Sequence, residues 1–261
     1  MKSTDSLLVK ILGFPATLIH GDSSVFDRWR WVAKRLPITR NDEQLLDVGC
    51  GTGAFTIGTA RRGYHATGLS WDVRNQTVAR ERASLCGVAS VEFPIGDARE
   101  LHSFVDFKGR FDVVVCCECI EHIINDRKLM IDLGECLKPG GRLLLTCPNV
   151  MYNPIVLFDA GPFRKIEDGW HVRKGYSPEM LRELCVEAGL KVEEIGYCAG
   201  FFTQVISWIL VKSSRVHYLF GWALSLPLRV LPPLLDGFVH AISKYPYYSI
   251  CLHAYKPRFR P

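Results

Sequence analysis

The sequence predicts an α/β fold in which helices cover both faces of a mostly parallel sheet. Short apolar segments alternate with segments of helical character from Gln44 to Cys147, and this alternation is typical of parallel strands joined by crossover helices. Glycine or proline closes most of these segments. A chain of 261 residues with 48% hydrophobic and 23% charged residues has ample mass for such a core. This composition argues against a disordered chain, a collagen-like fibre and a multi-span membrane protein.

The elements follow in order along the first part of the chain. Ser24 precedes Phe26, Trp29 and Val32 at helical spacing, so we expect a capped amphipathic helix that ends before Pro37. Apolar runs without helical period are strands, and the segments between them that end at glycine are helices. We expect strands at 44–48, 65–70 and 91–95 and helices at 54–62 and 75–86.

The second part of the predicted core continues the pattern and then changes. The run from Phe111 to Cys117 is apolar and β-branched in its middle, as in a buried strand. Ser177 is the expected cap of a helix at 178–188 that Gly189 ends. The remaining expected elements are a helix at 126–137 and strands at 142–147, 191–197 and 248–255.

About fifty residues rich in Leu, Phe, Trp and Tyr separate the last two predicted strands. They indicate an apolar helical insertion at the edge of the sheet. We therefore divide the chain into an N-terminal helical cap (1–40), a core (41–200), the insertion (201–247) and the last core strand with a basic tail (248–261).

A glycine-rich loop, Asp47-Val-Gly-Cys-Gly-Thr-Gly53, follows the first strand and opens a helix. Glycines allow a ligand to approach the backbone, and the helix start offers free N–H groups. The segment Gly49-x-Gly51-x-x-Ala54 also satisfies a loose dinucleotide fingerprint, and Ser70 with Arg74 after the second strand would permit NADP. An NADP-dependent oxidoreductase is therefore one alternative, although no Tyr-x-x-x-Lys pair follows the fifth strand. A non-catalytic protein of the same fold is the other.

Further motifs occur in a fixed order after the glycine loop. They are Gly96-Asp97-Ala98, the segment from Phe111 to His122, Leu137-Lys-Pro-Gly-Gly141 and Pro148-Asn149. With this set the chain resembles the class I S-adenosylmethionine-dependent methyltransferases, and it is most similar to the small-molecule branch that includes ubiquinone-biosynthesis O-methyltransferases. The resemblance implies a Rossmann-like, seven-stranded fold and S-adenosyl-L-methionine as the cofactor.

The resemblance also implies roles for individual residues. Gly49, Gly51 and Gly53 would line the methionine moiety, with Asp47 near its ammonium group. Ser70 stands where the family usually has an acid for the ribose, which is a departure from the pattern, and Asp72 could substitute. Trp71, Asp97 and Ala98 would contact the adenine, and Cys117 and Glu118 would face the methyl group; these positions complete the cofactor-binding set that we expect.

A hydroxyl acceptor benefits from a base of near-neutral pKa. His122, placed by Glu118-x-x-Glu121-His122, is the leading candidate, and His171 is the second. An amine or carbanion acceptor would need neither. We expect no metal, since Cys116-x-x-Cys119 lacks a second cysteine pair.

The formal net charge of +5 has an uneven distribution along the chain. From Ile195 onward there are seven basic residues and one acid, Asp236. Basic residues beside apolar ones suit an anionic bilayer surface. We expect a cytoplasmic protein with reduced cysteines, a small-molecule or lipid-linked acceptor, peripheral membrane contact through residues 201–247 and no nucleic-acid partner.

Overall fold

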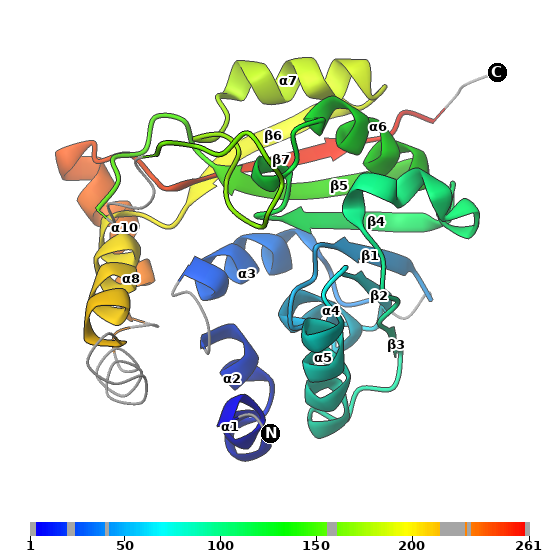
Figure 1. The fold of residues 1–261 in the computed structure, drawn as a ribbon, viewed down its shortest axis with the longest axis horizontal. Helices are drawn as coiled ribbons and strands as arrows, with labels where there is room; N and C mark the ends of the chain where they lie inside the picture. Colours follow the sequence, from blue (N-terminus) through cyan, green and yellow to red (C-terminus); the bar gives the residue numbers. More distant parts are fainter. Residues whose placement is uncertain are drawn as a thin grey trace.

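A computed structural model describes residues 4–19, 24–39, 42–155, 161–214, 228 and 231–258. Its centre is a seven-stranded sheet in the order β3-β2-β1-β4-β5-β7-β6 (Figure 1). The strands β1 to β5 pair in parallel, and β7 runs antiparallel between β5 and β6. The predicted fold class is confirmed. The strands are β1 (Gln44–Val48), β2 (His65–Leu69), β3 (Val91–Glu92), β4 (Phe111–Cys117), β5 (Leu137–Pro148), β6 (Lys191–Cys198) and β7 (Ser249–Tyr255).

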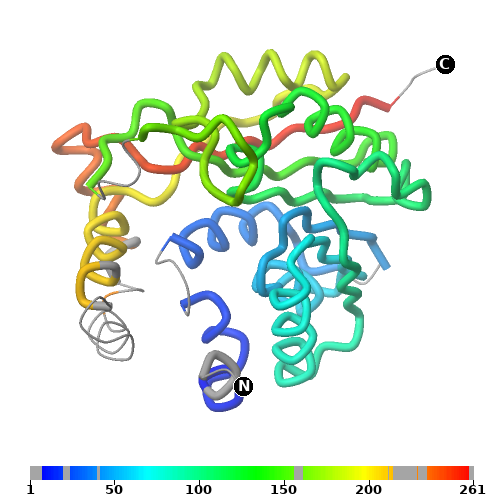
Figure 2. Tube along the Cα trace, in the orientation of Figure 1, coloured from blue at the N-terminus to red at the C-terminus, as the bar shows by residue number. Residues whose placement is uncertain are grey.

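Helices lie on both sides of this sheet (Figure 1). One face is covered by α3 (Ser24–Arg35), α4 (Ala54–Ala60) and α5 (Val73–Leu85), and the other by α6 (Asp126–Cys136) and α7 (Pro178–Glu187). The N-terminal helices α1 (Thr4–Leu12) and α2 (Phe14–Ile19), in dark blue, lie on the side of α3 and α4 (Figure 2). Three short 3₁₀ helices complete the described part of the core: η1 (Ala98–Ser103), η2 (Val105–Phe107) and η3 (Ile120–His122).

Strand β4 shows how the sheet fills two apolar layers. Val114 and Cys116 belong to the cluster with α6 and α7, and Val113 and Val115 belong to the cluster with α3. All four side chains are fully buried. The continuous apolar run in the sequence therefore reflects a strand that is covered on both faces.

Two strands differ in length from the prediction. β3 ends at Glu92 because Pro94 has no N–H to donate to the ladder, and Ile95 forms only an isolated bridge with Ser70. β5 begins at Leu137, before Pro139, and its pairing with β4 shifts register between Phe111 and Val113.

The insertion between β6 and β7 contains two described helices, α8 (Phe201–Ser214) and α10 (Leu231–Ser243), which contact each other. Asp236 of α10 is buried and accepts hydrogen bonds from the amides of Gly200, Phe202 and Thr203 at the start of α8. The parts of the predicted insertion at 215–227 and 229–230, and the end of the predicted tail at 259–261, lie outside the described residues. Among the residues that are described, no helix has the length and apolar character needed to cross a membrane.

Candidate functional site

A cavity of about 470 Å³ opens at the carboxyl ends of β1, β2 and β4, where ligands bind in sheets of this kind. Its wall comes from the loops after these three strands, from residues 96–99 after β3 and from residues 167–169. Eight residues that the sequence predicted for the site line it: Gly49, Gly51, Ser70, Trp71, Asp97, Ala98, Glu118 and His122.

The glycines of the loop have different surroundings. Gly51 has a φ of +52° and open space where a Cβ would lie, so the backbone there is accessible to a ligand. Gly53 has a φ of +78°, and a Cβ would lie 2.9 Å from Cβ of Ala79 and 3.0 Å from the ring of Phe93. The structure thus explains Gly53 by packing at the start of α4 rather than by the cavity lining.

Asp47 lies beneath the glycine loop at the end of β1 and is 2% exposed. Thr56 donates a hydrogen bond of 2.7 Å from Oγ1 to Oδ2 of Asp47. Burial raises the pKa of this carboxyl group to about 6. Ionisation of Asp47 therefore destabilises the folded protein unless a cation lies next to the carboxylate.

The residues after β2 differ in their surroundings. Ser70 is buried in the cavity wall, and Trp71 is 68% exposed at its rim. Asp72 uses its carboxylate as the cap of α5, accepting hydrogen bonds from the amides of Arg74 and Asn75. Oδ1 of Asp72 is therefore already bonded at the start of α5. Asp72 is the residue that we expected could replace the missing acid at the ribose.

Asp97 lies at the cavity edge and is paired with Arg99. Nε of Arg99 donates to Oδ1 and Oδ2 of Asp97 at 3.0 and 2.9 Å. This bonding lowers the pKa of Asp97 from its usual value, so the carboxylate is ionised and can accept a hydrogen bond from an adenine amino group.

Glu118 has a φ of +50° and directs its carboxylate into a polar cluster. Oε1 accepts hydrogen bonds of 3.1 Å from the hydroxyls of Thr146 and Ser249, and Nε of Arg28 lies 3.4 Å away. Arg28 was missed by sequence reasoning because it sits in a helix that reads as an amphipathic packing element. Neighbouring Cys117 is not part of the cavity lining, and burial raises the pKa of its thiol.

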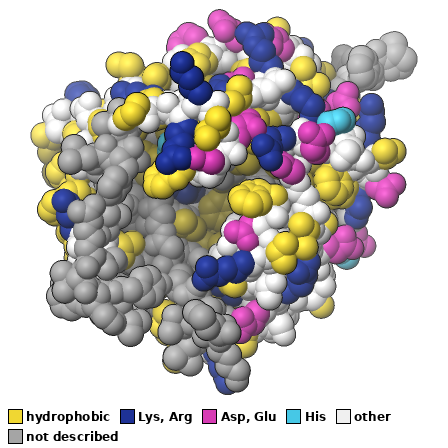
Figure 3. All heavy atoms as spheres, viewed as in Figure 1, with side chains coloured by type: hydrophobic (Ala, Val, Ile, Leu, Met, Phe, Trp, Pro, Cys, Tyr) yellow, Lys and Arg dark blue, Asp and Glu magenta, His cyan; other side chains and the backbone are white. Residues whose placement is uncertain are grey.

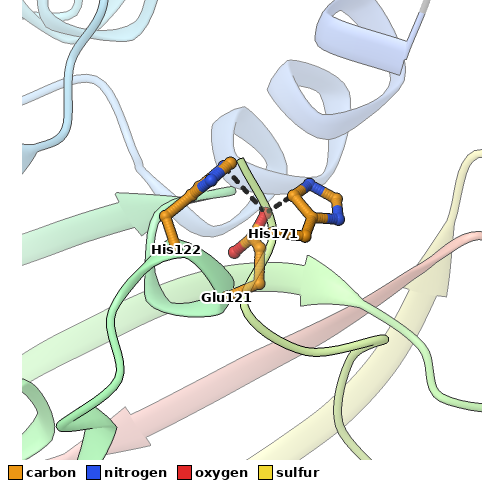
Figure 4. Close-up of side chains that lie close together, drawn as sticks. All are labelled: Glu121, His122 and His171. Carbon is orange, nitrogen blue, oxygen red and sulfur yellow. Dashed lines mark ion pairs between the residues drawn. The ribbon is translucent and has the colours of Figure 1, made fainter. Parts of the chain in front are cut away.

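The two candidate bases lie together beside a second cavity (Figure 4). This cavity, of about 410 Å³, is lined by His122, His171, Phe163, Trp170 and neighbouring residues. The two imidazole rings are close to perpendicular, at an interplanar angle of 72°, with centroids 4.8 Å apart. His122 lines both cavities, whereas His171 lines only the second.

Glu121 lies between the two histidines and was not predicted as a site residue. Its side chain is fully buried, and its Oε1 is 3.8 Å from Nε2 of His122 and 3.9 Å from Nε2 of His171 (Figure 4). Burial, and then the charge of Glu118, raise the pKa of Glu121 well above its usual value. Burial lowers the pKa of His122 and, together with the charge of His122, lowers the pKa of His171 to about 4. Both imidazoles are therefore neutral near pH 7.

Glu121, His122 and His171 also have the side-chain types of a metal site. Their ligand atoms lie within 4.8 Å of one another, and Oε1 of Glu121 lies 3.8 and 3.9 Å from the Nε2 atoms of the two histidines. Carboxylate oxygen and imidazole nitrogen are both ligands of zinc, so the cluster is compatible with metal binding as well as with proton transfer.

The glycine loop, the carboxylates at the end of β1 and the start of η1, and the cavity lined by Gly49, Gly51 and Asp97 define a class I S-adenosylmethionine-dependent methyltransferase. Residues 23–195 match the family model described as a methyltransferase domain, and the chain belongs to this family. The alternative of an NADP-dependent oxidoreductase has no such support.

Curated relatives agree with this assignment, and solved structures share the fold. The chain is 29% identical over 197 residues to a ubiquinone biosynthesis O-methyltransferase of Thiobacillus denitrificans, covering 74% of this chain and 82% of the relative. It is 28% identical over 172 residues to one of Xylella fastidiosa, covering 64% and 68%. The structure of Haemonchus contortus phosphoethanolamine N-methyltransferase 2, with S-adenosyl-L-methionine, is similar with a TM-score of 0.63 at 17% identity, covering 98% of this chain and 60% of that one.

Proposed function

We propose that this protein methylates a hydroxyl oxygen of a small-molecule or lipid-linked acceptor, with His122 as the general base. One observation carries the proposal: His122 lines both the cavity after the glycine loop and the second cavity beside it. A methyl donor in the first cavity and an acceptor in the second would meet at this imidazole. The relatives named as ubiquinone biosynthesis O-methyltransferases support an oxygen acceptor.

In this proposal the first cavity holds S-adenosyl-L-methionine, which supplies an activated methyl group on a sulfonium. Gly49, Gly51 and Asp47 would hold the methionine end, with Gly53 shaping the loop. Ser70 would bond the ribose, Asp97 would accept from the adenine amino group, and the remaining predicted contacts are Trp71, Ala98, Cys117 and Glu118. The cavity residues fit such a ligand, because they combine open space at Gly51 with the ionised Asp97.

His122 would take the acceptor hydroxyl proton on a ring nitrogen as the new O–CH₃ bond forms and the S–CH₃ bond of the sulfonium breaks, which would leave S-adenosylhomocysteine. His171 would orient the His122 ring from its near-perpendicular position at 4.8 Å. Phe163 and Trp170 in the second cavity would pack on an apolar or aromatic acceptor and exclude water from the reacting atoms.

The test is transfer of tritiated methyl groups to a panel of phenols, catechols and their prenylated derivatives, with the products divided into aqueous and organic phases. We expect labelled product with the wild type, and a loss of about 10²- to 10⁴-fold in kcat for His122→Gln. His65→Gln is the matched control, because His65 lies on β2 away from both cavities. Equal kcat for His122→Gln and the control would contradict the assigned base.

Two further readouts sharpen this test. Because burial lowers the pKa of His122, kcat should stay constant from about pH 8 down to the usual histidine pKa of about 6.5 and fall only below it. Treatment with EDTA should leave transfer unchanged if a histidine base suffices. If EDTA abolishes transfer and added divalent cation restores it, Glu121, His122 and His171 would be assigned as metal ligands instead.

We also propose that the chain is divided into the helical cap (1–40), the core (41–200), the insertion (201–247) and the last strand with its basic tail (248–261). The insertion would contact a membrane surface. Four side chains of α10 recur at helical spacing and are 50–70% exposed: Leu234, Leu235, Phe238 and Ile242. Lys244 follows on the same segment, and Lys212 lies over the ring of Trp208 on α8. Apolar side chains beside lysines suit the headgroup region of an anionic bilayer.

Flotation with liposomes tests this contact. We expect the wild type to float with vesicles that contain anionic lipid, and the double variant Phe238→Ser/Ile242→Ser to remain at the bottom. Val186→Ser is the control, since Val186 on α7 is also exposed, at 76%, but lies outside the insertion. Equal flotation of the double variant and the control would remove α10 from the contact.

A further inference from the structure

The loop of residues 161–175 forms part of the wall of both cavities. Glu167 and Gly169 line the first cavity, and Trp170 and His171 line the second. The N–H of Val172 donates to the carbonyl of Glu121 at 3.0 Å, which anchors the C-terminal side of the loop next to the candidate bases. The position of His171 therefore depends on how the rest of this loop is held.

Glu167 holds the loop through two hydrogen bonds. Its Oε1 accepts from the N–H of Ile124 at 2.5 Å, two residues beyond His122. Its Oε2 accepts from Nη1 of Arg99 at 2.9 Å. One carboxylate thus joins the loop both to the segment that carries His122 and to Arg99.

Arg99 uses the rest of its guanidinium group on Asp97. Nε donates to both carboxylate oxygens, and Nη2 donates to Oδ2 as well. The planar, rigid guanidinium fixes the two carboxylates relative to each other, which a flexible lysine could not do. Asp97, Arg99 and Glu167 line the same cavity.

We infer that Arg99 and Glu167 are positioning residues that couple occupancy of the adenine subsite at Asp97 to the placement of the loop carrying His171. This inference rests on the proposed role of Asp97 in cofactor binding. A ligand that fixes the carboxylate of Asp97 also fixes Arg99, and through it Glu167 and the loop. Because such coupling is reciprocal, fixing the loop also strengthens ligand binding at Asp97.

The exposed fractions of the three side chains indicate how strongly the adenine subsite and the loop are coupled. The Arg99 side chain is 46% exposed, and those of Asp97 and Glu167 are 28% and 20% exposed. Partly solvated ion pairs contribute only weakly, because water screens the charges. We therefore expect a change of about two- to fivefold in ligand affinity when the connection is broken.

Hydrogen exchange of residues 161–175, with and without saturating S-adenosylhomocysteine, tests the inference together with calorimetry for the affinity. The variants are Arg99→Gln, Glu167→Gln and both together, with Arg99→Lys as the conservative change. Arg127→Gln is the matched control, because Arg127 makes an ion pair with Glu187 between α6 and α7, outside the cavity lining.

In the wild type and the control, S-adenosylhomocysteine should slow exchange in the loop. In Arg99→Gln and Glu167→Gln it should still bind, about two- to fivefold more weakly, but no longer protect the loop. The double variant should bind no more weakly than the weaker single variant, and Arg99→Lys should restore little of the protection. Full protection of the loop in the single variants would overturn the inference. Absence of binding to the wild type would overturn the proposed cofactor role of Asp97 and this inference with it.

Discussion

The Asp47→Asn variant tests whether the ionised carboxyl group under the glycine loop lowers the free energy of unfolding. It also tests whether a cationic ligand pairs with this group. Burial raises its pKa from 3.8 to about 6. Because the folded pKa lies above the unfolded one, the folded state binds more protons, and stability falls as the pH rises from about 3.8 to about 6. The shift of about two units corresponds to about 3 kcal/mol of destabilisation above pH 6.

The asparagine side chain of the Asp47→Asn variant would keep the hydrogen bond from Thr56, since its amide oxygen is also an acceptor. Relative to the wild type, Asp47→Asn should then gain about 1 kcal/mol at pH 4.5 and about 3 kcal/mol at pH 7.5. Urea unfolding at both values measures the difference. Asp106→Asn is the control, because it makes the same change at an exposed position on η2.

The same substitution should weaken binding of S-adenosylhomocysteine, because the ammonium group would lose its carboxylate partner. Binding to the wild type should tighten as the pH rises from about 5 to 7 and Asp47 ionises. An equal stability difference between Asp47→Asn and the wild type at pH 4.5 and 7.5 would refute the destabilisation assigned to the ionised Asp47. Equally tight binding of this ligand by the variant and the wild type would refute the pairing of Asp47 with its ammonium group.

Three other predictions follow from the packing. Gly53→Ala should destabilise the protein by about 2–4 kcal/mol in urea unfolding, because alanine is strained in the left-handed conformation and its Cβ would crowd Ala79 and Phe93. Gly51→Ala should destabilise it by about 1–2 kcal/mol, because its Cβ would enter open space and only the backbone strain remains. Asp236→Ala should cost about 2–4 kcal/mol and speed hydrogen exchange at the start of α8, because several donors lose their acceptor; unchanged exchange there would show that α8 does not need this cap. Tyr176→Phe should cost about 1–2 kcal/mol, because the hydroxyl donates to Asp126 at 2.9 Å, and equal stability would contradict that contribution.

The strands around the site could be predicted because local sequence dominates there. The segments 44–48 and 111–117 are mostly apolar, and the structure places strands at those residues. The third strand was predicted too long, since Val91 to Ile95 is apolar enough for a strand but Pro94 interrupts the ladder. The local sequence pattern therefore predicts which segments form strands more reliably than it predicts where those strands end.

The polar contacts of the site could not be predicted in the same way. Arg99 and Glu167 are 68 residues apart in sequence, and no periodicity relates two loops that the fold brings to one cavity. Arg28 belongs to a helix whose aromatic residues fit an amphipathic surface element, yet Arg28 is buried against Glu118. Such pairs depend on tertiary approach, whereas the glycine loop and Asp97 are recognisable from short motifs.

The charge asymmetry of the chain becomes sharper when burial is considered. Asp236 is the only acid after residue 195, and it is 2% exposed because its carboxylate is used at the start of α8. The described lysines of the insertion, Lys212 and Lys244, are instead exposed. Elsewhere, on the face seen in Figure 3, basic and acidic side chains of the described residues are interspersed. The described surface of the insertion is therefore cationic and apolar without a compensating acid, which is the reason to test it against an anionic bilayer before any other partner.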